Sequence, residues 1–115
     1  MYKYIFLFLP FLFSCSETKQ SSTLPEAKMI QILVDIHLTE GKVNAMHLGT
    51  VDSSLVVYNY FEKQVFKKHG IDSTRFVNSL NDYIKEPKAF KELYKKVFAQ
   101  LDEQSNARNK SMKPL

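Results

Sequence analysis

The spacing of apolar residues between Pro25 and Leu101 limits the fold of this chain more than any other feature. Apolar residues recur there every three or four positions, which is the period of an α-helix with one buried face. No run alternates apolar and polar residues as a half-buried strand does. Gly49, Gly70 and Pro87 divide the region into four segments. We therefore predict an all-α fold, a small bundle of four short amphipathic helices over residues 25–101.

The ends of these segments carry recognisable capping residues. The stretch from Asp52 to Ser54 supplies good N-cap residues for the second helix, and Asp72 is one for the third. Gly70 suits the left-handed position that ends the second helix, after the positive charges of its last turn. The third helix is expected to turn five residues inward: Phe76, Val77, Leu80, Tyr83 and Ile84.

Residues 102–115 lose the apolar spacing of the preceding segment and gain small polar and basic residues. A segment of this composition has little apolar surface to bury and therefore gains little from folding. We predict that residues 102–115 form a disordered polar tail.

The chain opens with a short apolar segment, Tyr4 to Phe13, in which no residue is charged. As a helix it would extend about 15 Å, roughly half of a bilayer's hydrocarbon core. Lys3 before it and Ser14 after it match the charged start and the small residue near the cleavage point of an export signal. We predict a signal peptide over residues 1–14. An uncleaved short membrane anchor and a buried core segment are the alternatives.

The end of that segment, Leu12-Phe13-Ser14-Cys15, resembles the lipobox of bacterial lipoproteins. The resemblance implies that a lipid is attached to the sulfur of Cys15 and that the chain is cut before this residue. Cys15 is the only Cys of the chain, so an internal disulfide is excluded. Residues 15–24 then comprise the lipidated Cys and a flexible tether, which reaches roughly 30 Å when extended.

The densest polar cluster on an apolar background consists of Asp35, His37 and Glu40. Helical geometry places Glu40 on the apolar stripe, His37 at its border and Asp35 on the far side. A carboxylate among apolar groups has a raised pKa or needs a partner, so these three residues are a candidate functional cluster. One interpretation is a metal-dependent or other enzyme site around His37 and Glu40. The other is a structural contact of Glu40 with a backbone group or with a Lys or Tyr of another helix.

Other signals of catalysis are missing from the sequence. It contains no GxSxG nucleophile elbow, and its three Gly residues do not form a phosphate-binding loop. His47 lies about 15 Å further along the helix than His37, so the two rings cannot bind one ion. We therefore expect no catalytic residue, no metal, no cofactor and no small-molecule substrate.

The net charge of +4 is only mildly basic. The lysines of the fourth segment lie opposite its aromatic stripe, as on an ordinary solvated face, so we expect no nucleic-acid partner. Aromatic side chains beyond those that four short helices can bury would pair with another molecule. Tyr58, Tyr60, Phe66 and Tyr94 are the candidates for such an exposed interaction surface.

Together with the lipobox, the segments KMIQILVDIHLTEGKVN, FKKHGIDSTRFVNSL and YIKEPKAFKELYKKV resemble a family of small Bacteroidetes lipoproteins, domain of unknown function 4296. The most specific parts of the resemblance are Asp35, His37, Glu40 and the Lys68-His69-Gly70 turn. The resemblance implies a helical lipoprotein and brings no established activity. Ser16 directly after the Cys is similar to lipoproteins sent to the outer membrane.

From these features we predict a non-catalytic cell-envelope module, anchored to the outer membrane by lipid and facing the periplasm. Its expected partner is an unknown envelope protein or peptide. The alternatives are the metal-dependent or other enzyme around His37 and Glu40, and a chaperone-like periplasmic subunit that shields apolar segments in transit.

Overall fold

The computed structural model describes residues 23–114, so the predicted signal peptide, Cys15 and most of the predicted tether lie outside the described residues. Four α-helices follow one another: α1 (Glu26–Ala45), α2 (Val51–His69), α3 (Ser73–Lys85) and α4 (Pro87–Ser111). No strand occurs between residues 23 and 114. The predicted all-α fold with four helices is confirmed.

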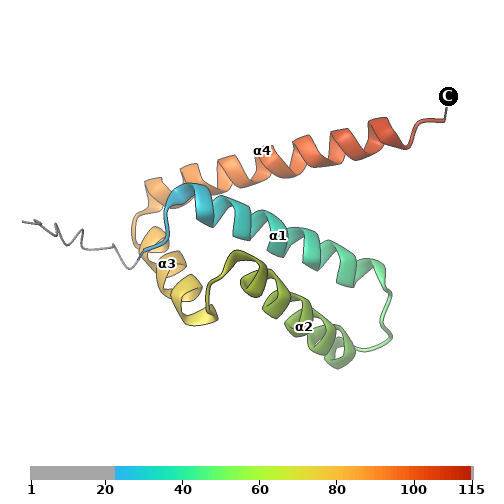
Figure 1. Ribbon diagram of the computed structural model, residues 1–115, viewed down its shortest axis with the longest axis horizontal. Helices are drawn as coiled ribbons and strands as arrows, with labels where there is room; N and C mark the ends of the chain where they lie inside the picture. Colours follow the sequence, from blue (N-terminus) through green and yellow to red (C-terminus); the bar gives the residue numbers. More distant parts are fainter. Residues whose placement is uncertain (1–22, 115) are drawn as a thin grey trace, which may run out of the picture.

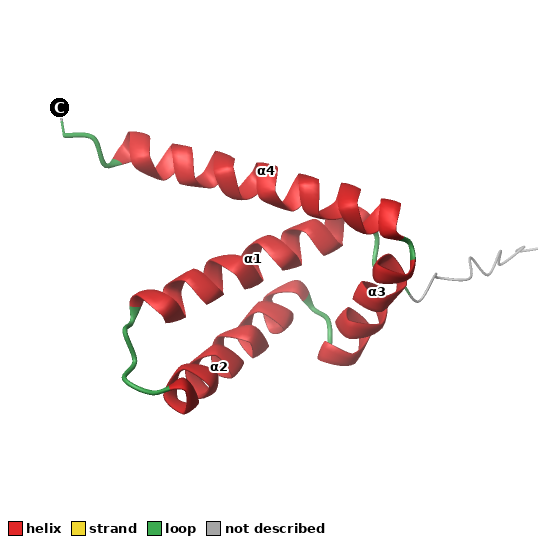
Figure 2. Ribbon diagram, turned by 180° about the vertical axis from the view of Figure 1, so that it is seen from behind, coloured by secondary structure: helices red, strands yellow, loops and turns green. Residues whose placement is uncertain are grey.

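α1 lies in the middle of the molecule, with α2 on one side and α4 on the other (Figure 1). α2 runs back alongside α1, whereas α4 runs in the same general direction as α1 and diverges from it toward its C-terminal end. Figure 2 shows the same order from behind, with the shorter α3 at the end where α1 begins. α3 packs against α4. α1 therefore touches a neighbouring helix on each of two sides.

α1 is the centre of the core because its apolar residues cover more than one face. Eight of its residues are buried: Met29, Ile30, Ile32, Leu33, Val34, Ile36, Thr39 and Val43. α4 adds Leu93 and Val97, which are fully buried, and α3 adds Phe76. α2 adds Val65 and Phe66, both from its second half. The first half of α2 therefore contributes no fully enclosed side chain to the core.

Local capping contacts fix the ends of α2 and α3. Thr50 caps α2 two residues earlier than predicted, since its Oγ1 accepts a hydrogen bond from the Ser53 N–H at 3.1 Å. Gly70 ends α2 in the predicted left-handed conformation, with a φ of 65°. Asp72 caps α3 as predicted, and its carboxylate accepts a hydrogen bond from the Arg75 N–H at 2.7 Å.

The buried face of α3 differs from the prediction. Val77 and Ile84, which were expected to point inward, are each 50% exposed. Ser79 is fully buried instead, because its Oγ accepts a hydrogen bond from the Leu24 N–H at 2.8 Å. The Tyr83 hydroxyl donates to the Leu24 carbonyl at 3.1 Å. These two contacts fix the segment before α1 to one face of α3, and that face becomes the inner one.

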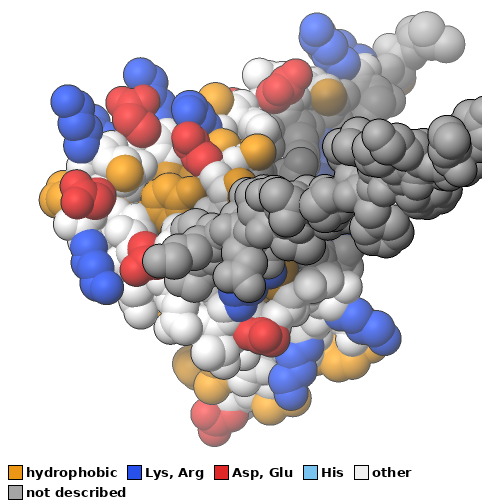
Figure 3. Space-filling view, turned by 60° about the vertical axis from the view of Figure 1, so that its left-hand side comes forward, with side chains coloured by type: hydrophobic (Ala, Val, Ile, Leu, Met, Phe, Trp, Pro, Cys, Tyr) orange, Lys and Arg blue, Asp and Glu red, His pale blue; other side chains and the backbone are white. Residues whose placement is uncertain are grey.

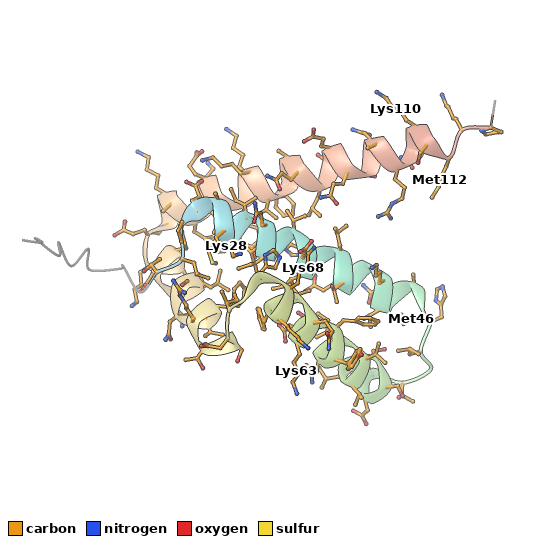
Figure 4. The ribbon with its side chains drawn as sticks, in the orientation of Figure 1. Lys28, Met46, Lys63, Lys68, Lys110 and Met112 are labelled. Atoms are coloured by element: carbon orange, nitrogen blue, oxygen red, sulfur yellow. The ribbon has the colours of Figure 1, made fainter. Side chains whose placement is uncertain are left out.

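The prediction of a disordered tail from residue 102 is wrong for most of this segment, because α4 continues to Ser111. Loss of the apolar spacing removes a packing face but leaves the helix propensity of Glu, Gln, Ala, Arg and Lys. A helix that has already formed also extends without a new nucleation step. After Pro87, no Gly or Pro interrupts the sequence before Pro114. The polar last turns of α4 are exposed throughout and carry Lys110 beyond the core (Figure 4).

Charges of both signs are mixed on the surface. On the face seen in Figure 3, Lys and Arg side chains alternate with Asp and Glu side chains, and apolar side chains lie between them. Neither sign of charge dominates that face.

Candidate functional site

Asp35 connects α1 to the end of α2. Its Oδ2 accepts hydrogen bonds from Lys68 Nζ at 2.9 Å and from His69 Nε2 at 2.7 Å. The Asp35 side chain is 21% exposed and that of His69 only 9%. Burial alone would raise the pKa of Asp35, but the hydrogen bonds and charges of Lys68 and His69 together outweigh it and hold this pKa below its usual value. We call these three residues the Asp35 cluster.

The Asp35 cluster occupies the side of α1 that the sequence places opposite Glu40. From the sequence alone, Lys68 and His69 are expected only to complement the dipole at the end of α2. In the structure Lys68 lies between α1 and α2 (Figure 4). Helical periodicity orders residues on one helix and does not say which helix lies opposite. The charge of Lys68, opposite in sign to that of Asp35, is the signal that could have paired them.

His37 and Glu40 form a second polar contact on α1. His37 Nδ1 lies 3.0 Å from Glu40 Oε2, one turn further along the helix. The expectation that apolar groups enclose Glu40 is wrong, because its side chain is 46% exposed and turns back along α1 to the ring of His37. That ring packs against α4, with its centroid 6.0 Å from that of Tyr94 and 6.4 Å from that of Phe98. In residues 23–114, His37 Nε2 is the buried side-chain polar atom that lacks a hydrogen-bond partner.

The charge of Glu40 also raises the pKa of one tyrosine in each neighbouring helix. Burial, followed by the charges of Glu62 and Glu40, raises the pKa of Tyr58 in α2 to about 12. Burial and then the charge of Glu40 raise the pKa of Tyr94 in α4. The Tyr58 hydroxyl donates its hydrogen bond to Glu62 Oε1 at 3.3 Å. The structure therefore brings Glu40, Tyr58 and Tyr94 into one neighbourhood that extends from α2 across α1 to α4.

The other two candidate surface aromatics lie in different environments. Phe66 is only 7% exposed and packs against Phe76, with 5.1 Å between the ring centroids, so its expected place on an exposed surface is wrong. Its position in α2 directs it toward α3, whose Phe76 completes the core there. Tyr60 is 61% exposed, and its ring lies at 71° to that of Phe61, with 5.6 Å between the ring centroids. Tyr60 is therefore the most exposed of the four aromatic candidates.

The described polar groups form pairs and small clusters rather than a set of convergent ligands. No three His, Cys, Asp or Glu side chains of residues 23–114 gather as the ligands of a metal ion would. His37 and Glu40 provide two such groups, and Asp35 is separated from them by its contacts with α2. This arrangement can hold helices together and can present charge and aromatic edges to another molecule.

The fold and this pattern of contacts define a small all-α domain built around one central helix. In the part of the chain that the structure describes, none of the helices has both the length and the hydropathy needed to cross a membrane. The chain belongs to the family domain of unknown function (DUF4296), whose family model matches residues 21–107. No curated protein and no solved structure matches the chain. The family thus covers all four helices, apart from the last turn of α4.

Proposed function

We propose that this protein is a lipid-anchored helical module of the cell envelope that binds another envelope protein or peptide and catalyses no reaction. The surface of the first half of α2 carries this proposal. Val51, Leu55, Val56 and Tyr60 are 83%, 55%, 69% and 61% exposed there. One exposed apolar side chain is ordinary. Here four lie within the first ten residues of one helix, as two pairs at four-residue spacing, Val51 with Leu55 and Val56 with Tyr60, so apolar groups cover about half of the circumference of this part of α2. We call these four residues the α2 apolar surface.

The state of the polar candidates also supports binding over chemistry. Asp35 accepts two hydrogen bonds from the end of α2, and Glu40 contacts the ring of His37. Each carboxylate of the candidate cluster therefore already has a partner within the protein. The contacts of Asp35 stabilise the position of α2 against α1, whereas the four apolar side chains at the start of α2 are exposed.

The proposed anchor comes from the lipobox-like sequence before Cys15, and Ser16 favours the outer membrane, with the domain on the periplasmic side. Leu24 is buried and bonded to α3, so the proposed tether ends before it, and residues 15–22 span at most about 27 Å when extended. The α2 apolar surface could therefore meet a partner that stands clear of the lipid headgroups.

Cross-linking in intact cells tests the proposal. A photo-cross-linking amino acid at Tyr60 is expected to capture one partner protein in near-stoichiometric amount, whereas the same amino acid at exposed Asn81 on α3 should capture only abundant bystanders. Bystanders alone at both positions would refute the proposal.

A matched pair of double variants separates the α2 apolar surface from apolar exposure in general. Val56→Ser with Tyr60→Ser should reduce partner recovery by chemical cross-linking about tenfold, because it removes two side chains from the surface. Val77→Ser with Ile84→Ser removes two side chains that are each 50% exposed, but from α3. Equal recovery from the two double variants would count against the α2 apolar surface.

A further inference from the structure

A cleft of about 580 Å³ lies between α1 and α2, with the end of α4 at its edge. Leu38, Gly41 and Ala45 line it from α1, at the three- and four-residue spacing that places them on one face of that helix. Phe61 and Val65 line it from α2. A side chain added at Gly41 would meet no atom within 4 Å, so the space above this part of α1 is open. We call this cleft the trough.

The charged residues of the trough are mostly cations. Lys42 of α1, Lys68 of α2 and Arg108 of α4 line it, and Asp35 is the one acidic residue among them. Asp35 is already paired with Lys68. Within residues 23–114, no carboxylate lies at ion-pairing distance from Lys42 or Arg108. Two positive charges from different helices therefore lie unpaired beside an apolar surface.

We propose that the trough binds an acidic amphipathic helix of a partner protein. Its apolar side chains would lie against Leu38, Ala45 and Phe61, and its carboxylates would pair with Lys42 and Arg108. A helix placed over α1 and beside α2 would interdigitate with side chains at the same three- and four-residue spacing, as helices in bundles do. The unpaired cations select an acidic partner, because a basic segment would be repelled.

This inference rests on the proposed function, since it assigns the domain a protein partner, and it adds a second surface and a partner chemistry. The trough uses the second half of α2, whereas the α2 apolar surface uses residues 51–60. The two surfaces can therefore be tested with separate cross-linking positions on the same full-length protein.

Gln64 and Lys63 provide the test and its control. Gln64 lines the trough, while its neighbour Lys63 lies on the outer side of α2 (Figure 4). A photo-cross-linking amino acid at Gln64, introduced in intact cells, should capture a segment that peptide mapping identifies as net negative, with apolar residues every three or four positions. The same amino acid at Lys63 should not capture that segment.

Three variants then change the trough, and circular dichroism checks that each one folds, because Lys42 and Arg108 also complement the dipoles in the last turns of α1 and α4. Lys42→Glu and Arg108→Glu are each expected to lower the yield at Gln64 about tenfold or more, because like charges would face the partner. Lys63→Glu changes the net charge equally and should leave the yield unchanged. Gly41→Leu should also lower the yield by filling the trough, while far-ultraviolet circular dichroism stays unchanged because Leu favours the helix.

Each outcome decides between the two proposals. Capture at Tyr60 without capture at Gln64 would overturn the trough and leave the proposed function standing. Capture at neither position would overturn both. Capture at Gln64 of a basic segment, of a segment without helical spacing or of lipid would overturn the assignment of the partner. An unchanged cross-linking yield at Gln64 in the Lys42→Glu and Arg108→Glu variants would also overturn the assignment of an acidic partner.

Discussion

Two glycines offer a direct test of the backbone of this fold. Gly41 lies within α1 and Gly70 ends α2 in the left-handed conformation, with a φ of 65°. A Cβ atom added at either position would meet nothing within 4 Å. Replacing either glycine by Ala therefore changes no packing contact, and only the backbone conformation should decide the sign of the effect.

The expected magnitudes follow from the two conformations. Ala is better than Gly inside a helix by about 0.8 to 1 kcal/mol, so Gly41→Ala should raise the free energy of unfolding by about that amount. An L-residue in the left-handed region costs about 1 to 2 kcal/mol, so Gly70→Ala should lower it. For a domain of this size, 1 kcal/mol corresponds to a change in Tm of about 4 to 8 °C. The two variants should thus move in opposite directions from the parent protein.

Thermal unfolding followed by circular dichroism, with urea titration as a second measurement, checks both variants. Gly70→Asn serves as a control, because Asn tolerates the left-handed conformation better than Ala and should lose less stability. A lower Tm for Gly41→Ala would mean that α1 does not continue through residue 41 as a regular helix. Shifts in the same direction for both Ala variants would refute the assignment of these effects to backbone conformation.

Four further predictions concern single side chains. Asp35→Asn should lower the free energy of unfolding by about 1 kcal/mol at neutral pH. Because the pKa of Asp35 is lower in the folded state than its unfolded value near 4, Asp35 stabilises the fold above about pH 4 and loses this effect as the pH falls through its folded-state pKa. Urea titrations of the variant and the parent protein should therefore differ at neutral pH and converge in strong acid. Glu40→Gln should lower the raised pKa of Tyr58, which alkaline titration of tyrosine absorbance measures. Ser79→Ala should cost about 1 to 3 kcal/mol in urea titration, because it leaves a backbone N–H without its acceptor. Native mass spectrometry should find Cys15 carrying acyl chains, and Cys15→Ser should release the protein from the membrane fraction; an unmodified Cys15 would refute the anchor.

The parts of the fold that sequence reasoning predicts are those set by neighbouring residues. The four helices follow from apolar spacing, and the left-handed end at Gly70 and the cap at Asp72 follow from contacts a few residues long. The extension of α4 to Ser111 was not predicted, because the apolar spacing reports burial and says nothing of intrinsic helix propensity. The inner face of α3 escapes it as well, since burial of Ser79 depends on a contact with Leu24, 55 residues away.

The candidate site is predictable only in part for a similar reason. Asp35, His37 and Glu40 are recognisable as polar residues on an apolar helix, and the spacing of His37 and Glu40 allows their contact within α1. The partners of Asp35 on α2 and the rings of α4 beside His37 depend on an arrangement of helices that the sequence does not contain. Phe66 illustrates the limit. An excess of aromatic residues predicts that some are exposed, yet only the contact with Phe76 decides that this one is not.

The polar residues of α1 contact both neighbouring helices, and the same helices border the proposed trough. Asp35 reaches the end of α2, while the ring of His37 packs against aromatic residues of α4. Apolar packing tolerates small rotations and shifts better than hydrogen bonds do, so we infer that the hydrogen bonds of Asp35 set the position of α2 relative to α1. Phe61 and Val65 of α2 line the trough, so loss of the Asp35 cluster should change both the stability of the fold and the binding of the partner. Lys42 forms no ion pair within the described residues, so its replacement should weaken binding while stability changes only by its small effect on the dipole of α1.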